Sequence, residues 1–244
     1  MKILKSTIFT IIAFGLLFAW LFPQFLWCFF VEYDSFQEIK PNIFVEEKIS
    51  KMQQDSLLKF VENAEKRIKT FWGGKSGQAK IIFTKNAMTY QKYAKTTEGA
   101  GFSIGTPLCS WIILNQDGLN TDVIAHEMCH DELMTKLGWW KTKKEIPTWF
   151  DEGLALMLDY RFVSSQDSIQ RYIDYRTELS YLSPVPIPLT ELNTQKDFFG
   201  QGELFTKIAY FTSAVEVSRR ISLKGKKEIF SIIKKTEKDG KFEF

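Results

Sequence analysis

The sequence predicts an α+β domain with a small mixed sheet, a buried central helix and a mainly helical C-terminal half, preceded by one transmembrane helix. Three observations support this prediction. Short runs rich in β-branched and aromatic residues, typical of strands, occur in the first 115 residues. Longer segments with apolar residues at helical spacing dominate the remainder. Near the amino terminus, an apolar run extends over residues 7–31.

The apolar run at residues 7–31 predicts a membrane anchor. At ~1.5 Å per residue it would reach about 37 Å as a helix, enough to cross a hydrocarbon core of ~30 Å. Lys2 and Lys5 precede the run and acidic residues follow it, so the positive-inside rule places the amino terminus in the cytoplasm. We therefore expect a single-pass protein of the cell membrane whose domain is extracytoplasmic.

The alternative interpretation of this run is a cleaved signal peptide followed by a secreted protein. No small-x-small cleavage site follows the apolar core, and bulky aromatic residues continue to its end. An uncleaved anchor is therefore favoured. It divides the chain into an anchor with the start of a linker at residues 1–35 and a single domain at residues 36–244.

The composition of the chain is that of an ordinary globular protein, with 45% hydrophobic and 25% charged residues. The formal charge of +3 includes Lys2 and Lys5, so the domain itself is close to neutral. Such a domain lacks the basic surface of a nucleic-acid-binding protein, and no nucleic-acid partner is expected. Cys28 lies in the apolar run, whereas Cys109 and Cys129 either form a disulfide or remain buried thiols.

The order of elements along the domain begins with strands and helices and then becomes helical. Alternation and β-branched content predict strands, and helical periodicity with capping residues predicts helices. Strands are expected at residues 43–45, 79–84 and 110–115, and helices at 50–72, 86–95, 120–138, 148–162, 164–177, 202–221 and 226–236. Loops are expected at 98–107 (glycine-rich), 138–146 (aromatic and basic) and 183–189 (proline-rich).

The helix expected at residues 120–138 contains the sequence His126-Glu127-Met128-Cys129-His130, which has the form H-E-x-x-H. Residues four apart share one helix face, so both imidazoles can bind a single metal ion. Glu127 is rotated by about 100° from His126 and borders the metal without ligating it. This placement suits a general base that acts on a metal-activated water. The chain contains 2 histidines, and both lie in this motif.

The third metal ligand must be a carboxylate, a thiolate or an amide oxygen, because no third histidine exists. Catalytic zinc commonly takes three protein ligands and keeps a fourth position for water. Glu152 is favoured by its place in the first turns of the next helix, where Gly153 allows a neighbouring backbone to come close. Asp151 and Asp159 are lesser candidates, interpreted as a helix cap and a surface charge. Asp131 is a candidate to orient one of the metal ligands through a hydrogen bond.

The two motifs together, H-E-x-x-H at residues 126–130 and P-x-W-x-x-E-G-x-A at residues 147–155, resemble the gluzincin metallopeptidases. The resemblance is specifically to the small peptidase-MA-like (minigluzincin) domains, and it covers roughly the last two hundred residues. It implies a zincin-like domain with one zinc ion held by His126, His130 and Glu152, and Glu127 as the catalytic glutamate. Cys129 and Asp131 depart from the residues usual in the family.

The resemblance also implies a role for Tyr210. The family commonly places an A-Y-x-x-s segment on the helix after the third ligand, and in related gluzincins a tyrosine or histidine there steadies the oxyanion. Tyr210 in residues 209–213 matches this segment, which makes it the candidate oxyanion donor. Its alternative is an amphipathic tyrosine of the core.

The strand before the metal helix edges the active-site cleft in the families that this chain resembles. An exposed strand edge offers unpaired backbone groups to an extended peptide. The candidate substrate contacts are therefore Trp111, Ile112, Ile113, Leu114 and Asn115. The alternative is a buried central strand.

The expected function is that of a membrane-anchored zinc peptidase. Glu127 would take a proton from a zinc-activated water that attacks a peptide bond of a peptide or protein substrate, and pass it to the leaving amine. The alternative is a catalytically silent, metal-binding membrane protein that keeps the fold for an interaction role.

Overall fold

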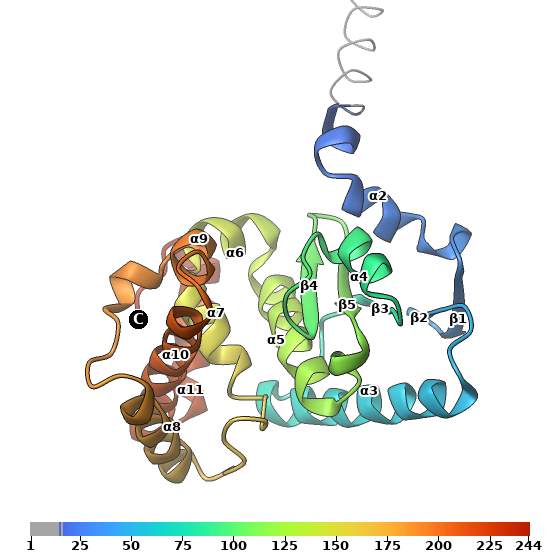
Figure 1. Ribbon diagram of the computed structural model, residues 1–244. Helices are drawn as coiled ribbons and strands as arrows, with labels where there is room; N and C mark the ends of the chain where they lie inside the picture. Colours follow the sequence, from blue (N-terminus) through green and yellow to red (C-terminus); the bar gives the residue numbers. More distant parts are fainter. Residues whose placement is uncertain (1–14, 16) are drawn as a thin grey trace, which may run out of the picture.

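The computed structural model of the chain describes residue 15 and residues 17–244. A half built on a β-sheet and a half built from helices lie side by side, with helix α5 between them (Figure 1). This arrangement confirms the prediction of an α+β fold with a mainly helical C-terminal half.

The sheet is mixed and has five strands in the order β1-β2-β3-β5-β4. Strand β2 pairs in parallel with β3, and β3 in parallel with β5, whereas the two outer strands are antiparallel to their neighbours. The bounds are β1 Phe36–Lys40, β2 Ile43–Glu46, β3 Lys80–Phe83, β4 Gly101–Gly105 and β5 Ser110–Leu114. Strands β2, β3 and β5 match the sequence prediction. Strand β1 lies in a segment for which the sequence predicted no strand, and β4 lies in the segment expected to be a glycine-rich loop.

Side chains alternate along the central strands, so each face of the sheet supports its own core. Ile81 and Phe83 point into the large core shared with α3 and α5. Ile82, between them, joins Trp111 and Tyr93 in a smaller core on the opposite face. Burial on both faces is what parallel strands require, and it explains their continuous apolar sequence.

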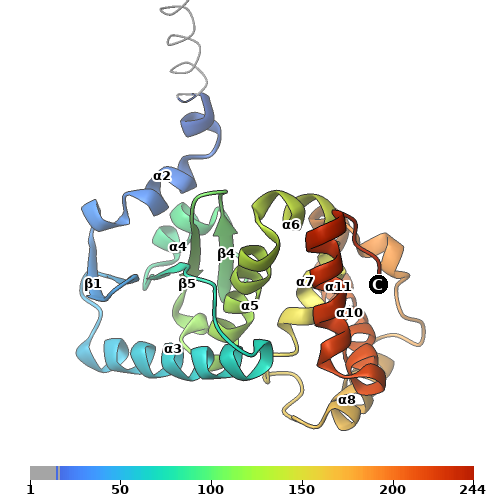
Figure 2. The same cartoon turned by 180° about the vertical axis from the view of Figure 1, so that it is seen from behind.

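Local sequence signals set the ends of the three helices in the sheet half. Ser50 and Gln53 form a capping box at the start of α3 (Lys51–Trp72), and the Asn86 side chain caps α4 (Ala87–Ala94). Asn120 caps α5 (Thr121–Leu137), and Gly138 ends it with a φ of 80°. In Figure 2, α3 runs beneath the sheet and α4 lies above it.

The C-terminal half contains three longer helices, α8, α10 and α11, and several short ones. The bounds are α6 Trp139–Glu145, α7 Thr148–Ala155, α8 Ser168–Leu182, α9 Gln195–Phe199, α10 Glu203–Lys224 and α11 Lys226–Asp239, with a short 3-10 turn at Leu189–Leu192; a second such turn, Gln116–Gly118, lies between β5 and α5 in the sheet half. Two corrections apply. The expected loop at 138–146 is largely helical, since it contains α6. Helix α7 ends at Ala155 rather than near residue 162, because residues 156–158 form a turn.

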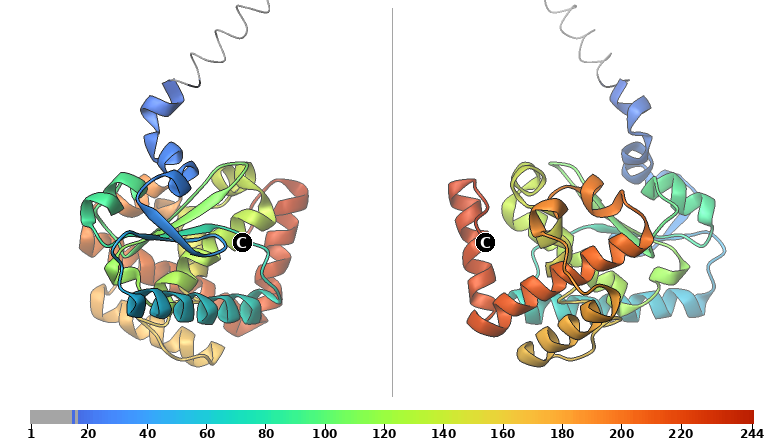
Figure 3. Two further views of the ribbon diagram at one scale, coloured as in Figure 1. Left: turned by 90° about the vertical axis from the view of Figure 1, so that its right-hand side faces the viewer. Right: turned by 60° about the vertical axis from the view of Figure 1, so that its left-hand side comes forward.

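The end of the predicted transmembrane run belongs to the folded domain. Helix α2 (Pro23–Phe29) and a 3-10 turn at Val31–Tyr33 cover the sheet on the side of α4, and Cys28 and Val31 are buried in the smaller core (Figure 3). Residues 7–14 and 16 of that run lie outside the described residues. Among residue 15 and residues 17–244, no helix is both long enough and apolar enough to cross a bilayer.

Candidate metal centre

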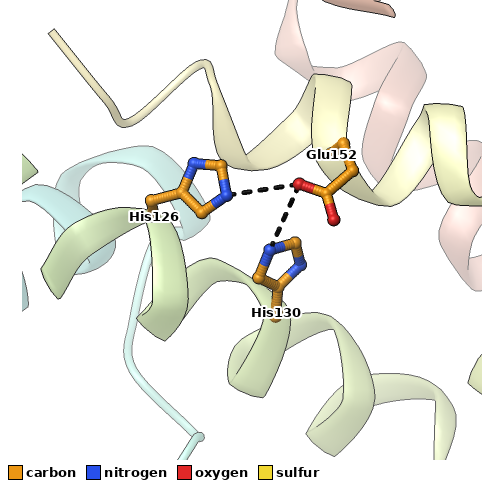
Figure 4. A group of neighbouring side chains, drawn as sticks. All are labelled: His126, His130 and Glu152. Carbon is orange, nitrogen blue, oxygen red and sulfur yellow. Dashed lines mark ion pairs between the residues drawn. The ribbon is translucent and has the colours of Figure 1, made fainter. Parts of the chain in front are cut away.

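Helices α5 and α7 bring three potential metal ligands together. His126 and His130 project from one face of α5, and Glu152 faces them from α7 (Figure 4). One Glu152 carboxylate oxygen, Oε2, lies 3.3 Å from His126 Nε2 and 3.7 Å from His130 Nε2. The ligand atoms of the three residues all lie within 4.8 Å of one another, so the group could hold a metal ion.

The environment of Glu152 Oε2 fits a cation. This oxygen is buried and makes no hydrogen bond within the described part of the chain. A buried carboxylate oxygen without a partner is costly, and a metal ion between it and the two imidazoles would remove that cost. The prediction that His126, His130 and Glu152 form one site agrees with this geometry, while the geometry leaves the identity of the metal open.

Asp151 fixes the orientation of the His130 imidazole. Its Oδ1 lies 2.6 Å from His130 Nδ1, so Nδ1 donates to Asp151 and Nε2, on the side of Glu152, is the nitrogen that a cation could bind in place of a proton. The sequence interpretation of Asp151 as a helix cap is wrong. Pro147 occupies the cap position of α7, and no side chain caps the helix.

Asp159 takes the corresponding position beside His126. Its Oδ2 lies 3.7 Å from His126 Nδ1, and the Arg161 guanidinium holds both of its carboxylate oxygens at 2.5–3.1 Å. The interpretation of Asp159 as a surface charge is therefore wrong, because the residue is completely buried. Its distance from His126 is too long for a hydrogen bond, so its effect on that ring is electrostatic.

A buried arginine, Arg171, and a half-buried one, Arg67, hold the segment that carries Asp159. Arg171 donates to the backbone oxygens of Leu156 and Asp159 at 2.8 and 2.9 Å. Asp122, near the start of α5, accepts from Arg67 at 2.6 Å and from the Tyr160 backbone N–H at 3.0 Å. These contacts tie the segment after α7 to the start of α5 and so fix the position of Asp159 relative to His126.

The centre carries a surplus of negative charge. Burial lowers the pKa of His130, but the charges of Asp151 and Glu152 outweigh it and raise that pKa to about 10. Burial raises the pKa of Glu127, and the neighbouring His126 opposes this only in part. Arg161 forms an ion pair with Asp159 and so neutralises one of the carboxylates around the two imidazoles. A divalent cation would balance the remaining carboxylates.

Glu127 lies between the two imidazoles in sequence and against strand β4 in space. A Cβ built on Gly101 would meet Glu127 Cγ at 2.9 Å and its Oε1 at 3.0 Å. The strand can therefore pass this carboxylate so closely only because residue 101 is glycine. This contact places the predicted general base at the edge of the sheet.

Gly153 allows the Glu152 helix to pack against α10. A Cβ at this position would lie 2.6 Å from the backbone oxygen of Ser213, closer than any side chain tolerates. The prediction that Gly153 permits a close backbone approach is confirmed. This contact sets the depth at which Glu152 enters the centre.

Tyr210 lies beside the metal centre and borders a cavity. Its ring centroid is 6.4 Å from that of His126 and 5.1 Å from that of Phe198. The cavity has a volume of about 500 Å³ and a mainly apolar lining that includes Leu156, Phe162, Tyr175, Leu204 and Phe211. Burial raises the pKa of the Tyr210 phenol, so it stays protonated and able to donate a hydrogen bond.

Strand β5 cannot serve as the substrate edge. It is hydrogen-bonded to β3 on one side and to β4 on the other, so the prediction of substrate pairing is wrong for the five residues Trp111, Ile112, Ile113, Leu114 and Asn115. The first four are buried, and the Asn115 side chain caps the turn that follows. The free outer edge of the sheet at this end belongs to β4 instead.

Asp131 has a structural role, and the two cysteines considered from the sequence are not joined. Asp131 accepts hydrogen bonds from Ser110 Oγ at 2.6 Å and from the Ala79 backbone N–H at 3.0 Å, so it braces the sheet and does not orient a histidine. Cys109 and Cys129 are free thiols, and the disulfide considered from the sequence is not formed.

Comparison with known proteins assigns no family to the chain. No protein-family model matches the chain, and a search of curated proteins finds no match. The gluzincin resemblance therefore stays a prediction.

Proposed function

We propose that the chain is a zinc-dependent peptidase of the gluzincin type with a zincin-like domain. The observation that carries this proposal is the convergence of His126, His130 and Glu152 on one point, with the Glu127 carboxylate nearby. Two imidazoles and one carboxylate are a donor set of catalytic zinc, and three protein ligands leave one position for water. Zinc, when bound, makes water a stronger acid and polarises a carbonyl oxygen.

Glu127 performs the proton transfers in this proposal. Its carboxylate accepts a proton from the attacking water and delivers it to the nitrogen of the scissile bond. This nitrogen then leaves as a neutral amine, whereas without the proton it would have to leave as an amide anion, a poor leaving group. Tyr210 donates a hydrogen bond to the oxyanion that forms on the substrate carbonyl. The position of Tyr210 next to His126 supports this role.

Strand β4 positions the substrate. It is the outer strand of the sheet and its residue Gly101 touches Glu127, so an extended peptide paired with this edge would bring a backbone carbonyl toward the metal centre. Pairing through backbone groups selects for an extended chain rather than for a particular sequence. The apolar cavity beside Tyr210 suits a large apolar side chain of that peptide.

The apolar amino-terminal run anchors the domain to the cell membrane, with the domain outside the cytoplasm. The support is the apolar character of residues 7–22, which precede the packed helix α2, and the position of Lys2 and Lys5 before them. Secretion after signal cleavage is the alternative, and the mass of the mature amino terminus distinguishes the two.

The experiment is a peptide-library digest by the purified full-length chain, read by mass spectrometry with and without a chelator. The Glu127→Gln variant should bind zinc as the wild type does and lose hydrolysis. Glu98→Gln, which changes an exposed glutamate in the loop before β4, is the matched control and should keep activity. Undiminished hydrolysis by Glu127→Gln would reject the proton-transfer role. Zinc binding without any cleavage by the wild type would favour the catalytically silent alternative.

A further inference from the structure

Large apolar side chains are exposed at one end of the molecule, where the chain enters from the amino terminus. In Figures 1 to 3, which are related by rotation about the vertical axis, α2, the β4–β5 turn and α6 all lie at the upper end. Leu108 in the turn is 87% exposed and Trp140 in α6 is 71% exposed. We use the name apical surface for this end of the molecule, whose α2 segment, β4–β5 turn and α6 carry the exposed side chains of Leu26, Trp27, Phe30, Leu108 and Trp140.

The turn that presents Leu108 is rigid. Thr106 Oγ1 accepts from the backbone N–H groups of Leu108 and Cys109, each at 3.2 Å, and the Thr106 N–H donates to the Cys109 oxygen at 2.8 Å. Trp139 Nε1 donates to the Gly105 oxygen at 2.7 Å, which ties α6 to the same turn. Leu108 is thus exposed on a turn that these four hydrogen bonds hold in place, where its apolar side chain faces water.

Helix α2 has a fixed orientation on the domain. Phe29 packs edge-on against Trp111 with ring centroids 5.3 Å apart, and the Lys92 ammonium lies 4.2 Å from the centre of the Trp27 ring. Lys92 also bonds Asp34 at 2.5 Å, just after the helix. The exposed face of α2, with Leu26 and Phe30, therefore belongs to the same rigid body as the turn and α6.

The length of the remaining apolar run favours a bilayer as the occupant of this surface. Because residues 23–31 are packed on the domain, the part of the run left to cross a membrane is residues 7–22. As a helix these sixteen residues would reach about 24 Å, against a hydrocarbon core of ~30 Å. A short span is accommodated by local thinning of the bilayer, by flanking residues that reach into the interface or by oligomerisation, and the first two bring the adjoining domain close to the lipid.

The chemistry of the apical surface fits the lipid interface. Tryptophan is enriched at the level of the headgroups, where its apolar ring and its N–H group are both accommodated. Helix α6 adds the exposed Lys143 and Lys144 beside Trp140, and long lysine side chains can reach anionic headgroups while their stems lie along apolar surface.

We propose that the apical surface lies in the interface of an anionic bilayer, so that the domain rests on the membrane at three points: α2, the β4–β5 turn and α6. This inference rests on the proposed amino-terminal anchor and goes beyond it, because an anchor alone leaves the domain free to tumble. Three-point contact holds the metal centre at a constant height above the lipid. It restricts substrates to chains that come close to the membrane surface.

The test uses an added indole as a depth probe. The full-length chain is reconstituted into vesicles of phosphatidylcholine and phosphatidylglycerol whose acyl chains carry bromine, which quenches tryptophan fluorescence on contact. Leu108→Trp places the probe in the turn. Leu223→Trp is the matched control, because Leu223 is 69% exposed at the junction of α10 and α11, at the opposite end of the molecule. The native tryptophans give the same background in both variants.

We expect the emission added by Leu108→Trp to shift to the blue and to be quenched, and that added by Leu223→Trp to be unaffected. We also expect Trp140→Glu to reduce the quenching of the turn probe. If the chains float with the vesicles but the bromine quenches the indoles of Leu108→Trp and Leu223→Trp equally, the three-point contact is wrong and the anchor stands. Failure of the chain to float would overturn both. A concentration-dependent dimer in detergent that is lost in Leu108→Glu, without quenching in vesicles, would instead assign the surface to a second copy.

Discussion

Replacement of Asp151 by asparagine tests how the protein prepares His130 for a metal. The Asp151 carboxylate accepts a hydrogen bond from His130 Nδ1 at 2.6 Å, a length typical of a charge-assisted bond. Loss of such a partner generally weakens metal binding by about 10–100-fold, or roughly 1.4–2.8 kcal/mol. Asparagine can still accept the bond but without the charge, so we expect the lower end of this range, about 10-fold. Asp151→Ala removes the acceptor and should reach about 100-fold.

The assay for this prediction is competition for zinc between the purified full-length chain and a chromophoric chelator. Asp131→Asn is the matched control, since it removes a buried carboxylate next to His130 in sequence whose partners are Ser110 and Ala79. It should lower the thermal stability of the fold and leave the zinc affinity within a factor of about two, because it does not touch the imidazoles. Wild-type affinity in Asp151→Ala, or an equal loss in Asp131→Asn, would refute the reasoning.

Three further predictions concern the site and its frame. Tyr210→Phe should keep the zinc affinity and lower kcat by about 100-fold or more, the usual effect of losing an oxyanion donor; unchanged kcat on a peptide found in the library digest would exclude that role. Gly153→Ala should destabilise the fold by about 1–3 kcal/mol in urea unfolding, because its Cβ would press against the Ser213 oxygen, and an unchanged midpoint would contradict the close approach. The hydrogen bond from Lys92 lowers the pKa of Asp34 from 3.8 to about 2. The stability from this contact is therefore present above about pH 4 and lost as the pH falls through about 2. Asp34→Asn should cost about 1 kcal/mol at pH 7 and less near pH 2, and a cost that does not fall with pH would contradict the assignment.

The parts of the fold that sequence predicts well depend on local chemistry. Ser50, Asn86 and Asn120 cap helices at the expected positions, because a cap is decided by a side chain and the backbone two or three residues away. The two histidines share a helix face because their spacing matches the helical repeat. Glu152 is also placed by its own helix, which begins at an expected position.

The parts that sequence misses depend on contacts between distant segments. Strand β4 is rich in glycine and resembles a loop until it pairs with β5, and that pairing removes β5 from the edge of the sheet. Asp151 and Asp159 gain their roles from His130 and His126, which lie 21 and 33 positions earlier in the chain. No local pattern distinguishes a carboxylate that faces an imidazole from one that faces water. The apolar sequence of α2 similarly does not indicate whether the helix packs on lipid or on protein.

The central claim is that His126, His130 and Glu152 together hold one divalent cation. Its most direct measurement is the metal content of the purified full-length chain, determined by elemental analysis after equilibration with zinc and exhaustive dialysis. The wild type is compared with Glu152→Gln and with Asp167→Asn, which changes an exposed helix cap. We predict one zinc ion per chain in the wild type and in Asp167→Asn, and its loss from Glu152→Gln. A wild type that takes up no cation, or a Glu152→Gln variant that keeps it as firmly, would contradict the account.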